Sequence, residues 1–504
     1  MKKILAILMC AAMLLCIAPV GAVAADTEAL PSGTAINSEN GLGAITGSGD
    51  FYLAEDIYVD LTTATLPLIA DGFTGTLDGN GHSIIFKDKT TGALKNTATL
   101  SASGGIIFKV CTAKSVKNLT VGSPDAPAVV TSNQANVGVL AMESNARLSF
   151  ESVTVYGELI SNRSGTMNYG LFMAKGKNNI EFNSCAAIGK ITVNVQGNFI
   201  YKLGGFMGTF TSTGTGGGIS VAFNNCISDV AIGAAEGITI ANGSYGGGLL
   251  GCHDCANRAS NFTANNCISL KTPVMKNSAG KSAMVGPFFG GVLADGDPVA
   301  NTDEAKAERV SVTSSATLDT LAEELALTTD RAASVRFDAP TGIRYRHSVS
   351  GLYDTLVALC GAENVKLGTL IAPVLFVNDA GAFTKEALDA LEGINSERYI
   401  DVPFGGEWYS DMKDNTYTYV GSIANVLEQN YSVEFAGIGY ISYKLGDEWT
   451  TVYADYAVVE GQSGIPAYSV SYLADCVVRD AEANPDKYTA SELAAVQKYL
   501  PKED

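Results

Sequence analysis

The sequence predicts a mainly β protein, in which a right-handed parallel β-helix is followed by a separate, β-rich α+β domain. Three observations predict it: a phrase that recurs every 41 residues, the lack of helical apolar patterns between residues 100 and 295, and a change of composition near residue 300. The 504 residues carry a net charge of −19. Residues 301–504 hold 15 basic and 32 acidic side chains, which leaves −17 there, with both tryptophans and 15 of the 21 tyrosines.

Residues 1–24 predict a secretory signal peptide. Lys2 and Lys3 precede an apolar run from Ile4 to Val20, and small residues follow up to Ala25. A membrane anchor is the alternative, but a run of about 17 residues that contains Pro19 is shorter than the roughly 20 that a span needs. We therefore expect an exported protein, secreted or at the cell surface, without a transmembrane segment after cleavage.

Residues 25–295 predict the β-helix with its N-terminal cap. The strongest repeat is spaced by 41 residues and reads Phe182-Asn183-Ser184-Cys185, Phe223-Asn224-Asn225-Cys226 and Ala264-Asn265-Asn266-Cys267. A glycine followed by apolar residues also recurs, at Gly105, Gly138, Gly170, Gly205, Gly248 and Gly291. Short alternating β-branched runs lie between these phrases. A unit of roughly 35 residues with about three short strands is typical of one coil that stacks on the next.

Stacking predicts the roles of the repeated residues. Coils in register lie about 4.8 Å apart, so Asn183, Asn224 and Asn265 should form an amide ladder near a corner. Cys185, Cys226 and Cys267 should stack beside it. We expect small buried apolar side chains there rather than disulfides, since a disulfide needs Cβ atoms about 3.8 Å apart.

The segment before the repeats predicts two strands joined by the turn Asp78-Gly79-Asn80-Gly81. The phrase from Phe73 to Ile84, followed by repeats of the Gly-Gly-Phe-Met-Gly and Asn-Asn-Cys-Ile-Ser type, resembles the GLUG-type β-helix repeats of bacterial surface proteins over about residues 37–295. The resemblance implies an adhesin or an exported protein of unknown role. Some β-helices are polysaccharide lyases or hydrolases.

The β-helix offers weak candidates for chemistry. Glycoside hydrolysis needs paired carboxylates, and the acidic residues between Ser101 and Ala294 follow no repeated or clustered pattern in the sequence. Asp78 and His82 form a possible pair, but we expect Asp78 to bond its own backbone. The segment Cys252-His253-Asp254-Cys255 could bind metal or exchange thiols, yet it lacks a second ligand pair. We therefore expect no catalytic residue, metal or cofactor.

Residues 296–310 predict a polar linker, and residues 311–504 an acidic, aromatic-rich α+β domain. A short helix near Leu321 should precede strands at 333–337, 342–347, 365–371, 399–402, 416–420, 432–443 and 450–456. A helical apolar stripe follows from Val470 to Ala481, and the capping box of Thr489 and Glu492 opens the last helix. Phrases such as Thr341-Gly342-Ile343-Arg344-Tyr345 resemble an uncharacterised module of exported proteins from clostridia-like bacteria, over most of 330–500. That resemblance implies location and brings no known catalytic residues.

Aromatic residues give the second domain a candidate ligand-binding site at Trp408, Tyr409, Tyr417 and Trp449. Aromatic faces beside polar groups suit a glycan or a protein partner, although a β-rich core uses the same residues to fill volume. His347, which stands among arginines and a serine, is expected on the surface. The charge of −17 argues against nucleic acid as a partner.

These features favour an exported, non-enzymatic surface or adhesion-type protein, in which a β-helix presents a C-terminal module that binds a glycan or a protein. One alternative is a polysaccharide-active lyase or hydrolase that uses the β-helix groove. Another is a structural spacer without its own ligand.

Overall fold

The computed structural model describes residues 31–197, 199–211, 219–240, 243–254, 260–276, 284–294, 297–299, 310–337, 340–392, 398–413 and 415–500. The expected signal peptide and most of the expected linker lie outside these residues. The chain is mainly β and divides into two compact units, Met1–Leu321 and Ala322–Asp504.

The first unit is built from four sheets that are parallel apart from one antiparallel pair. The first sheet runs in the order β1 (Thr34–Ile36), β2 (Phe51–Leu53), β4 (Thr76–Asp78), β8 (Ser115–Lys117), β13 (Leu148–Glu151), β17 (Ile180–Asn183), β21 (Ile219–Asn224), β25 (Ser260–Asn265) and β30 (Val310–Thr313). The second runs in the order β3 (Ile57–Tyr58), β5 (Ser83–Ile85), β9 (Thr120–Val121), β14 (Thr154–Ser161), β18 (Ala186–Val193), β22 (Ile227–Ala234), β26 (Ile268–Ser269) and β31 (Ala316–Thr317), with β10 (Ala128–Ser132) joining β14 to β6 (Thr97–Leu100).

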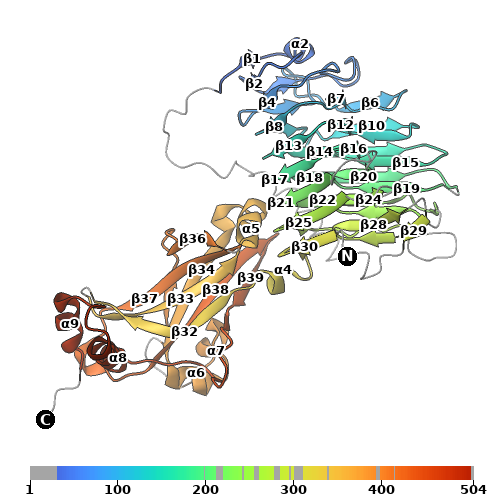
Figure 1. Ribbon diagram of the computed structural model, residues 1–504. Coiled ribbons are helices and arrows are strands. Elements are labelled where there is room, and N and C mark those ends of the chain that lie inside the picture. Colours follow the sequence, from blue (N-terminus) through green and yellow to red (C-terminus); the bar gives the residue numbers. More distant parts are fainter. Residues whose placement is uncertain are drawn as a thin grey trace. The chain divides into compact units, whose positions relative to one another are not determined.

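The third and fourth sheets complete this unit. The third contains β11 (Asn136–Gly138), β15 (Met167–Gly170), β19 (Tyr201–Gly204), β23 (Tyr245–Gly247) and β27 (Met284–Gly286). The fourth contains β7 (Phe108–Val110), β12 (Ala141–Ser144), β16 (Met173–Gly176), β20 (Met207–Thr211), β24 (Leu250–Asp254), β28 (Phe289–Ala294) and the antiparallel β29 (Asp297–Val299). The helix α2 (Glu39–Gly43) lies near the N-terminal end of the described chain (Figure 1).

From β11 onward the chain adds one strand to each of the four sheets in turn, so that β15, β16, β17 and β18 are followed by β19, β20, β21 and β22 (Figure 1). The repeating unit therefore has four short strands where the sequence predicted about three. Two strands of the predicted second domain, β30 and β31, pair with β25 and β26, and β29 of the predicted linker pairs with β28. The first unit thus extends beyond the expected end at residue 295.

The corner between the first and second sheets explains the 41-residue repeat. Asn183, Asn224 and Asn265 are register partners, and Asn224 Nδ2 donates to Asn183 Oδ1 at 2.9 Å. The next residue of each turn adopts a positive φ of 45–53° at Asn118, Ser152, Ser184, Asn225, Asn266 and Ser314. Asparagine tolerates this region best among non-glycine residues. The repeat is thus a turn with a fixed backbone conformation.

The residue after the positive-φ position points into the core. Cys185, Cys226 and Cys267 are free thiols at most 1% exposed, and each Sγ lies 3.3–3.4 Å from the main-chain oxygen two residues before it. Beside them, the rings of Phe150, Phe182 and Phe223 stack with centroids 5.0 and 4.7 Å apart. The cysteines therefore fill core volume, as small apolar residues do.

The glycine phrase has a different register from the one the sequence predicted. The glycines in register are Gly138, Gly170, Gly204, Gly247 and Gly286, so the expected positions Gly205 and Gly248 are one residue late and Gly291 is five residues late. A Cβ at any of the registered glycines would lie 1.8–2.4 Å from the carbonyl oxygen three residues ahead. Any side chain would therefore clash with main chain at this sharp turn between the third and fourth sheets.

The second unit contains two sheets and several helices (Figure 1). One sheet has the order β36 (Ser410–Lys413), β37 (Thr416–Ala424), β33 (Gly342–Ser350), β32 (Thr328–Val335) and β40 (Asp455–Tyr456). The other has the order β35 (Ile400–Pro403), β34 (Val365–Pro373), β38 (Phe435–Leu445) and β39 (Glu448–Tyr453). The helices are α4 (Leu321–Glu324, at the division between the units), α5 (Leu352–Cys360), α6 (Val374–Ala380), α7 (Lys385–Asp389), α8 (Val470–Ala483) and α9 (Ala490–Gln497), with 3-10 turns η2 (Ala362–Asn364) and η3 (Glu428–Asn430).

The last two helices follow from their sequence signals. Ser469 caps α8, whose buried residues belong to the apolar stripe that the sequence indicated. Thr489 and Glu492 form the predicted capping box at the start of α9, which ends at Gln497 rather than near Leu500. Helices α5, α6 and α7 were not predicted.

His347 lies in the core between the two sheets, so its expected surface position is wrong. It is fully buried, with Nδ1 2.9 Å from Thr329 Oγ1 and Nε2 2.9 Å from Thr369 Oγ1. Gly439 leaves room for it, because a Cβ there would lie 3.0 Å from the imidazole. Burial lowers the pKa of His347 from 6.5 to about 3, so the ring is neutral at physiological pH and bridges the two sheets through hydroxyl groups.

Candidate functional site

An aromatic cluster forms where the loop after β35 leads to β36. The indole of Trp408 stacks on Tyr417 of β37 with ring centroids 4.6 Å apart and an interplanar angle of 20°. Phe404 lies 4.6 Å from the same indole, and Tyr353 of α5 meets it edge-on at 5.4 Å. These four half-buried side chains, called the Trp408 cluster below, come from three separate segments of the chain.

A carboxyl group completes the Trp408 cluster. Tyr417 donates its hydroxyl to Asp354 Oδ2 at 2.5 Å. Burial raises the pKa of Asp354, although the bond from Tyr417 partly offsets this effect, and burial also raises the pKa of Tyr417. The aspartate keeps further lone pairs that can accept a ligand hydroxyl. Apolar faces beside a hydrogen-bond acceptor are the elements of a sugar- or peptide-binding surface.

The structure separates the four predicted binding residues. Tyr409 follows Trp408 directly and is 63% exposed, with its main-chain nitrogen bonded to Thr418. Trp449 lies on β39, at the other edge of the four-stranded sheet from β35, and Lys366 Nζ lies 4.4 Å from its ring centroid. Trp449 is therefore a second, isolated aromatic surface and not part of the Trp408 cluster.

Sequence reasoning missed three members of this site, namely Tyr353, Asp354 and Phe404. Tyr353 and Asp354 lie on α5, a helix that the sequence did not predict, about 55 residues before Trp408. Phe404 follows Pro403, where β35 ends. Nothing in their spacing signals that they meet.

The turn at Asp78 is structural. Asp78 Oδ1 accepts from the Asn80 main-chain nitrogen at 2.8 Å and from Asn118 Nδ2 at 3.1 Å, and its Oδ2 pairs with Lys117. Asn80 and Gly81 have φ values of 50° and 78°, and a Cβ at Gly79 would lie 2.2 Å from a main-chain oxygen. His82 Nδ1 lies 3.6 Å from Asp56 Oδ1 instead.

The Cys252-His253-Asp254-Cys255 segment lies partly on β24, and Cys255 falls outside the described residues. His253 is buried, with its ring 5.6 Å from that of Phe210, and Asp254 pairs with Lys202 at 3.2 Å. Among the residues that the structure describes, no group of three or more histidine, cysteine, aspartate and glutamate side chains could hold a metal ion.

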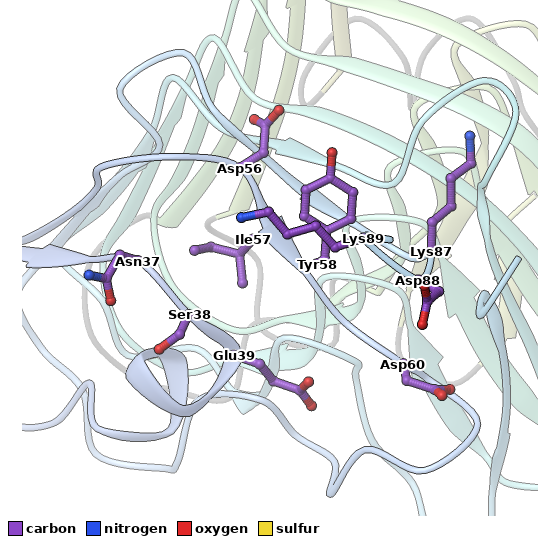
Figure 2. Close-up of a pocket in the computed structure, with 10 residues that line it drawn as sticks. All are labelled: Asn37, Ser38, Glu39, Asp56, Ile57, Tyr58, Asp60, Lys87, Asp88 and Lys89. Carbon is purple, nitrogen blue, oxygen red and sulfur yellow. The ribbon is translucent and has the colours of Figure 1, made fainter. Parts of the chain in front are cut away.

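A hollow of about 380 Å³ lies near the N-terminal end of the first unit (Figure 2). Most of its charged groups are already paired, since Lys87 bonds Asp125, Lys89 lies 3.1 Å from Glu55, and Asp60 lies 3.0 Å from Lys95. Asp88 accepts from Thr90 and Thr91, which lowers its pKa. The hollow therefore offers few free polar groups to a ligand. It is lined by Asn37, Ser38, Glu39, Asp56, Ile57, Tyr58, Asp60, Lys87, Asp88 and Lys89.

Comparisons with known proteins add no relative: no protein-family model, no curated protein and no solved structure matches the chain. Across the described residues, every helix is too short or too polar to cross a membrane.

Proposed function

We propose that this chain is an exported bacterial protein, secreted or held at the cell surface, that acts in adhesion rather than catalysis. In this proposal the first unit is a right-handed parallel β-helix of the GLUG-like type that serves as a scaffold. The regular addition of one strand to each sheet per coil supports this reading. The second unit is a separate α+β domain that binds a glycan or a surface protein. The basic and apolar character of residues 2–20 supports export.

The Trp408 cluster with its exposed neighbour Tyr409 carries the binding proposal. The side chain of Tyr409, next to the cluster, is largely exposed to solvent. Met412, the third residue of β36, is 45% exposed. The Asp354 carboxyl lies within the cluster through its bond to Tyr417. A rigid aromatic edge with one acceptor matches a ligand that has both apolar faces and hydroxyl or amide donors.

Binding of the full chain to a glycan array and to bacterial cell-wall fractions tests the proposal. We expect enrichment over heat-denatured chain, and loss of most of that enrichment in Tyr409→Ala. Tyr472→Ala is the matched control, because Tyr472 of α8 is 53% exposed and lies outside the Trp408 cluster. Trp449→Ala tests whether the second aromatic surface contributes to binding independently of the Trp408 cluster. No enrichment of the native chain on any surface would refute the proposal.

A further inference from the structure

A half-buried lysine without a counter-ion lies on β16 of the first unit. Its neighbours are paired, since Lys177 Nζ lies 2.8 Å from Glu143 Oε2 and Lys202 Nζ lies 3.2 Å from Asp254 Oδ2. Lys175 is the register partner of Glu143, yet within the described ranges no acceptor or ion-pair partner engages it. The sequence spacing gave no sign that Glu143 and Asp254 both act on the charge of this one lysine.

Charge at this position is disfavoured by the protein itself. Burial lowers the pKa of Lys175, and Lys177 and Lys202 lower it further, whereas Glu143 and Asp254 only partly offset them. Three cations thus share two carboxylates. A negatively charged ligand would offset this unfavourable environment.

Two buried hydroxyl groups next to the lysines also lack partners. Thr209 follows Lys175 in register on β20, and Tyr245 follows Lys202 in register on β23. Both side chains are only 1% exposed, and neither Thr209 Oγ1 nor the Tyr245 hydroxyl has a hydrogen-bond partner in the part of the chain that is described. Leaving a buried hydroxyl group unsatisfied is unfavourable, so each of the two could donate to a bound ligand.

Packing brings the Lys175–Thr209 pair of the fourth sheet close to the Lys202–Tyr245 pair of the third sheet. The Tyr245 ring lies against Gly291, where a Cβ would be 2.9 Å from the ring. Burial raises the pKa of Tyr245, and the nearby Cys252 and Asp254 raise it further, which puts the tyrosine beside the carboxylate that Lys202 holds. Thr209 lies between Lys175 and Cys252 in the fourth sheet. Tyr245 of the third sheet therefore lies against the column of the fourth sheet that contains Lys175 and Thr209.

We infer that Lys175, Lys177, Lys202, Thr209 and Tyr245 form a binding site for an oxyanion, either a free ion or the carboxylate or sulfate group of an acidic glycan. Lys175 is the main ligand, because among the described residues no carboxylate forms an ion pair with it. The hydroxyl groups of Thr209 and Tyr245 donate to the same anion, and Lys177 and Lys202 contribute positive potential while they remain paired. Charge-assisted hydrogen bonds of this kind are the strong ones in protein sites.

Calorimetric titration of the full chain tests the site with three probes: sodium sulfate, galacturonate and polygalacturonate. We expect measurable binding at low ionic strength that weakens as salt is added. Lys175→Gln should weaken binding at least about tenfold, and Thr209→Val should weaken it by a smaller factor. Lys190→Gln is the matched control, since Lys190 is exposed on β18 in another sheet and loses the same charge. Tighter binding of the polymer identifies a glycan ligand, and equal binding of all three identifies a free ion.

Thermal melting separates a binding role from a structural one. Removing an unpaired, half-buried charge should leave the melting temperature of Lys175→Gln unchanged or raise it. Thr209→Val should also melt no lower than wild type, because it removes an unsatisfied hydroxyl. Absence of binding by all three probes, wild-type affinity in Lys175→Gln, or a lowered melting temperature of that variant would each overturn the inference.

Discussion

The buried imidazole of His347 should make the second unit sensitive to mild acid. The folded unit holds this ring neutral, with a pKa of about 3, because burial excludes the charged form. In the unfolded chain the ring takes up a proton near its ordinary pKa of 6.5. Below pH 6.5 the unfolded state therefore binds more protons than the folded state. The free energy of unfolding decreases as the pH falls from 6.5 to the pKa of the folded state, about 3.

The size of the effect follows from the two pKa values. Each pH unit between them costs about 1.4 kcal/mol, so lowering the pH from 7.5 to 5 should cost about 2 kcal/mol. At pH 4 the cost should reach about 3 kcal/mol. These losses are a large fraction of the stability of an ordinary domain.

Urea unfolding followed by tryptophan fluorescence measures this in the intact chain. Trp408 and Trp449 both lie in the second unit, so the signal reports that unit alone. His347→Gln isolates the histidine, because glutamine can donate to one of the two threonines and accept from the other without titrating. His82→Gln, in the first unit, is the control and should behave as wild type.

The decisive quantity is the difference between wild type and His347→Gln in the stability lost from pH 7.5 to pH 5. Using this difference cancels other groups, including Asp354, whose raised pKa acts in the opposite direction. We expect wild type to lose about 2 kcal/mol more than the variant. An equal loss in both proteins would refute the assignment of His347 as a buried neutral bridge.

Two further predictions concern the first unit. Gly204→Ala should destabilise it by about 3 kcal/mol, because the new methyl group would lie 1.8 Å from Met207 O. Gly43→Ala, whose methyl group would have nothing within 4 Å, should be neutral or stabilise the unit by up to about 1 kcal/mol. Thermal melts of the two variants that coincide, measured by far-UV circular dichroism, would contradict this prediction. Iodoacetamide should label Cys476 long before Cys185, Cys226 and Cys267, which are buried, and burial raises the pKa of Cys226 well above its usual value. Peptide mass spectrometry measures the order of labelling. Early labelling of the three buried cysteines would show that they are accessible to solvent and would contradict the prediction.

The sequence revealed turns better than it revealed register. The Asn-x-Cys turn could be recognised because its backbone needs a residue that tolerates positive φ, here Asn or Ser, followed by an inward-pointing side chain. The glycine phrase was misplaced by one residue at Gly205 and Gly248 because adjacent glycines are equivalent in a sequence. Only the close approach of the carbonyl three residues ahead distinguishes Gly204 from Gly205.

His347 shows a second limit of sequence reasoning. Its neighbours Arg346 and Ser348 suggest a surface strand, and strand alternation alone does not tell which face is buried. The inward face is fixed by residues far along the chain, namely Thr369, which bonds the ring, and Gly439, which leaves space for it. Long-range packing of this kind has no local signal.

The proposed oxyanion site shows where function should be sought in such a chain. Positions that serve the fold repeat their residue type, as Asn183, Asn224 and Asn265 do. The column that contains the unpaired lysine does not repeat: it reads Glu143, Lys175, Thr209, Cys252 and Gly291 on successive strands. A neighbouring buried column, Ser144, Gly176, Phe210 and His253, changes its chemistry as well. It is therefore the unpaired Lys175 and the unsatisfied Thr209 hydroxyl, rather than the changing residue types, that a ligand explains better than the architecture does.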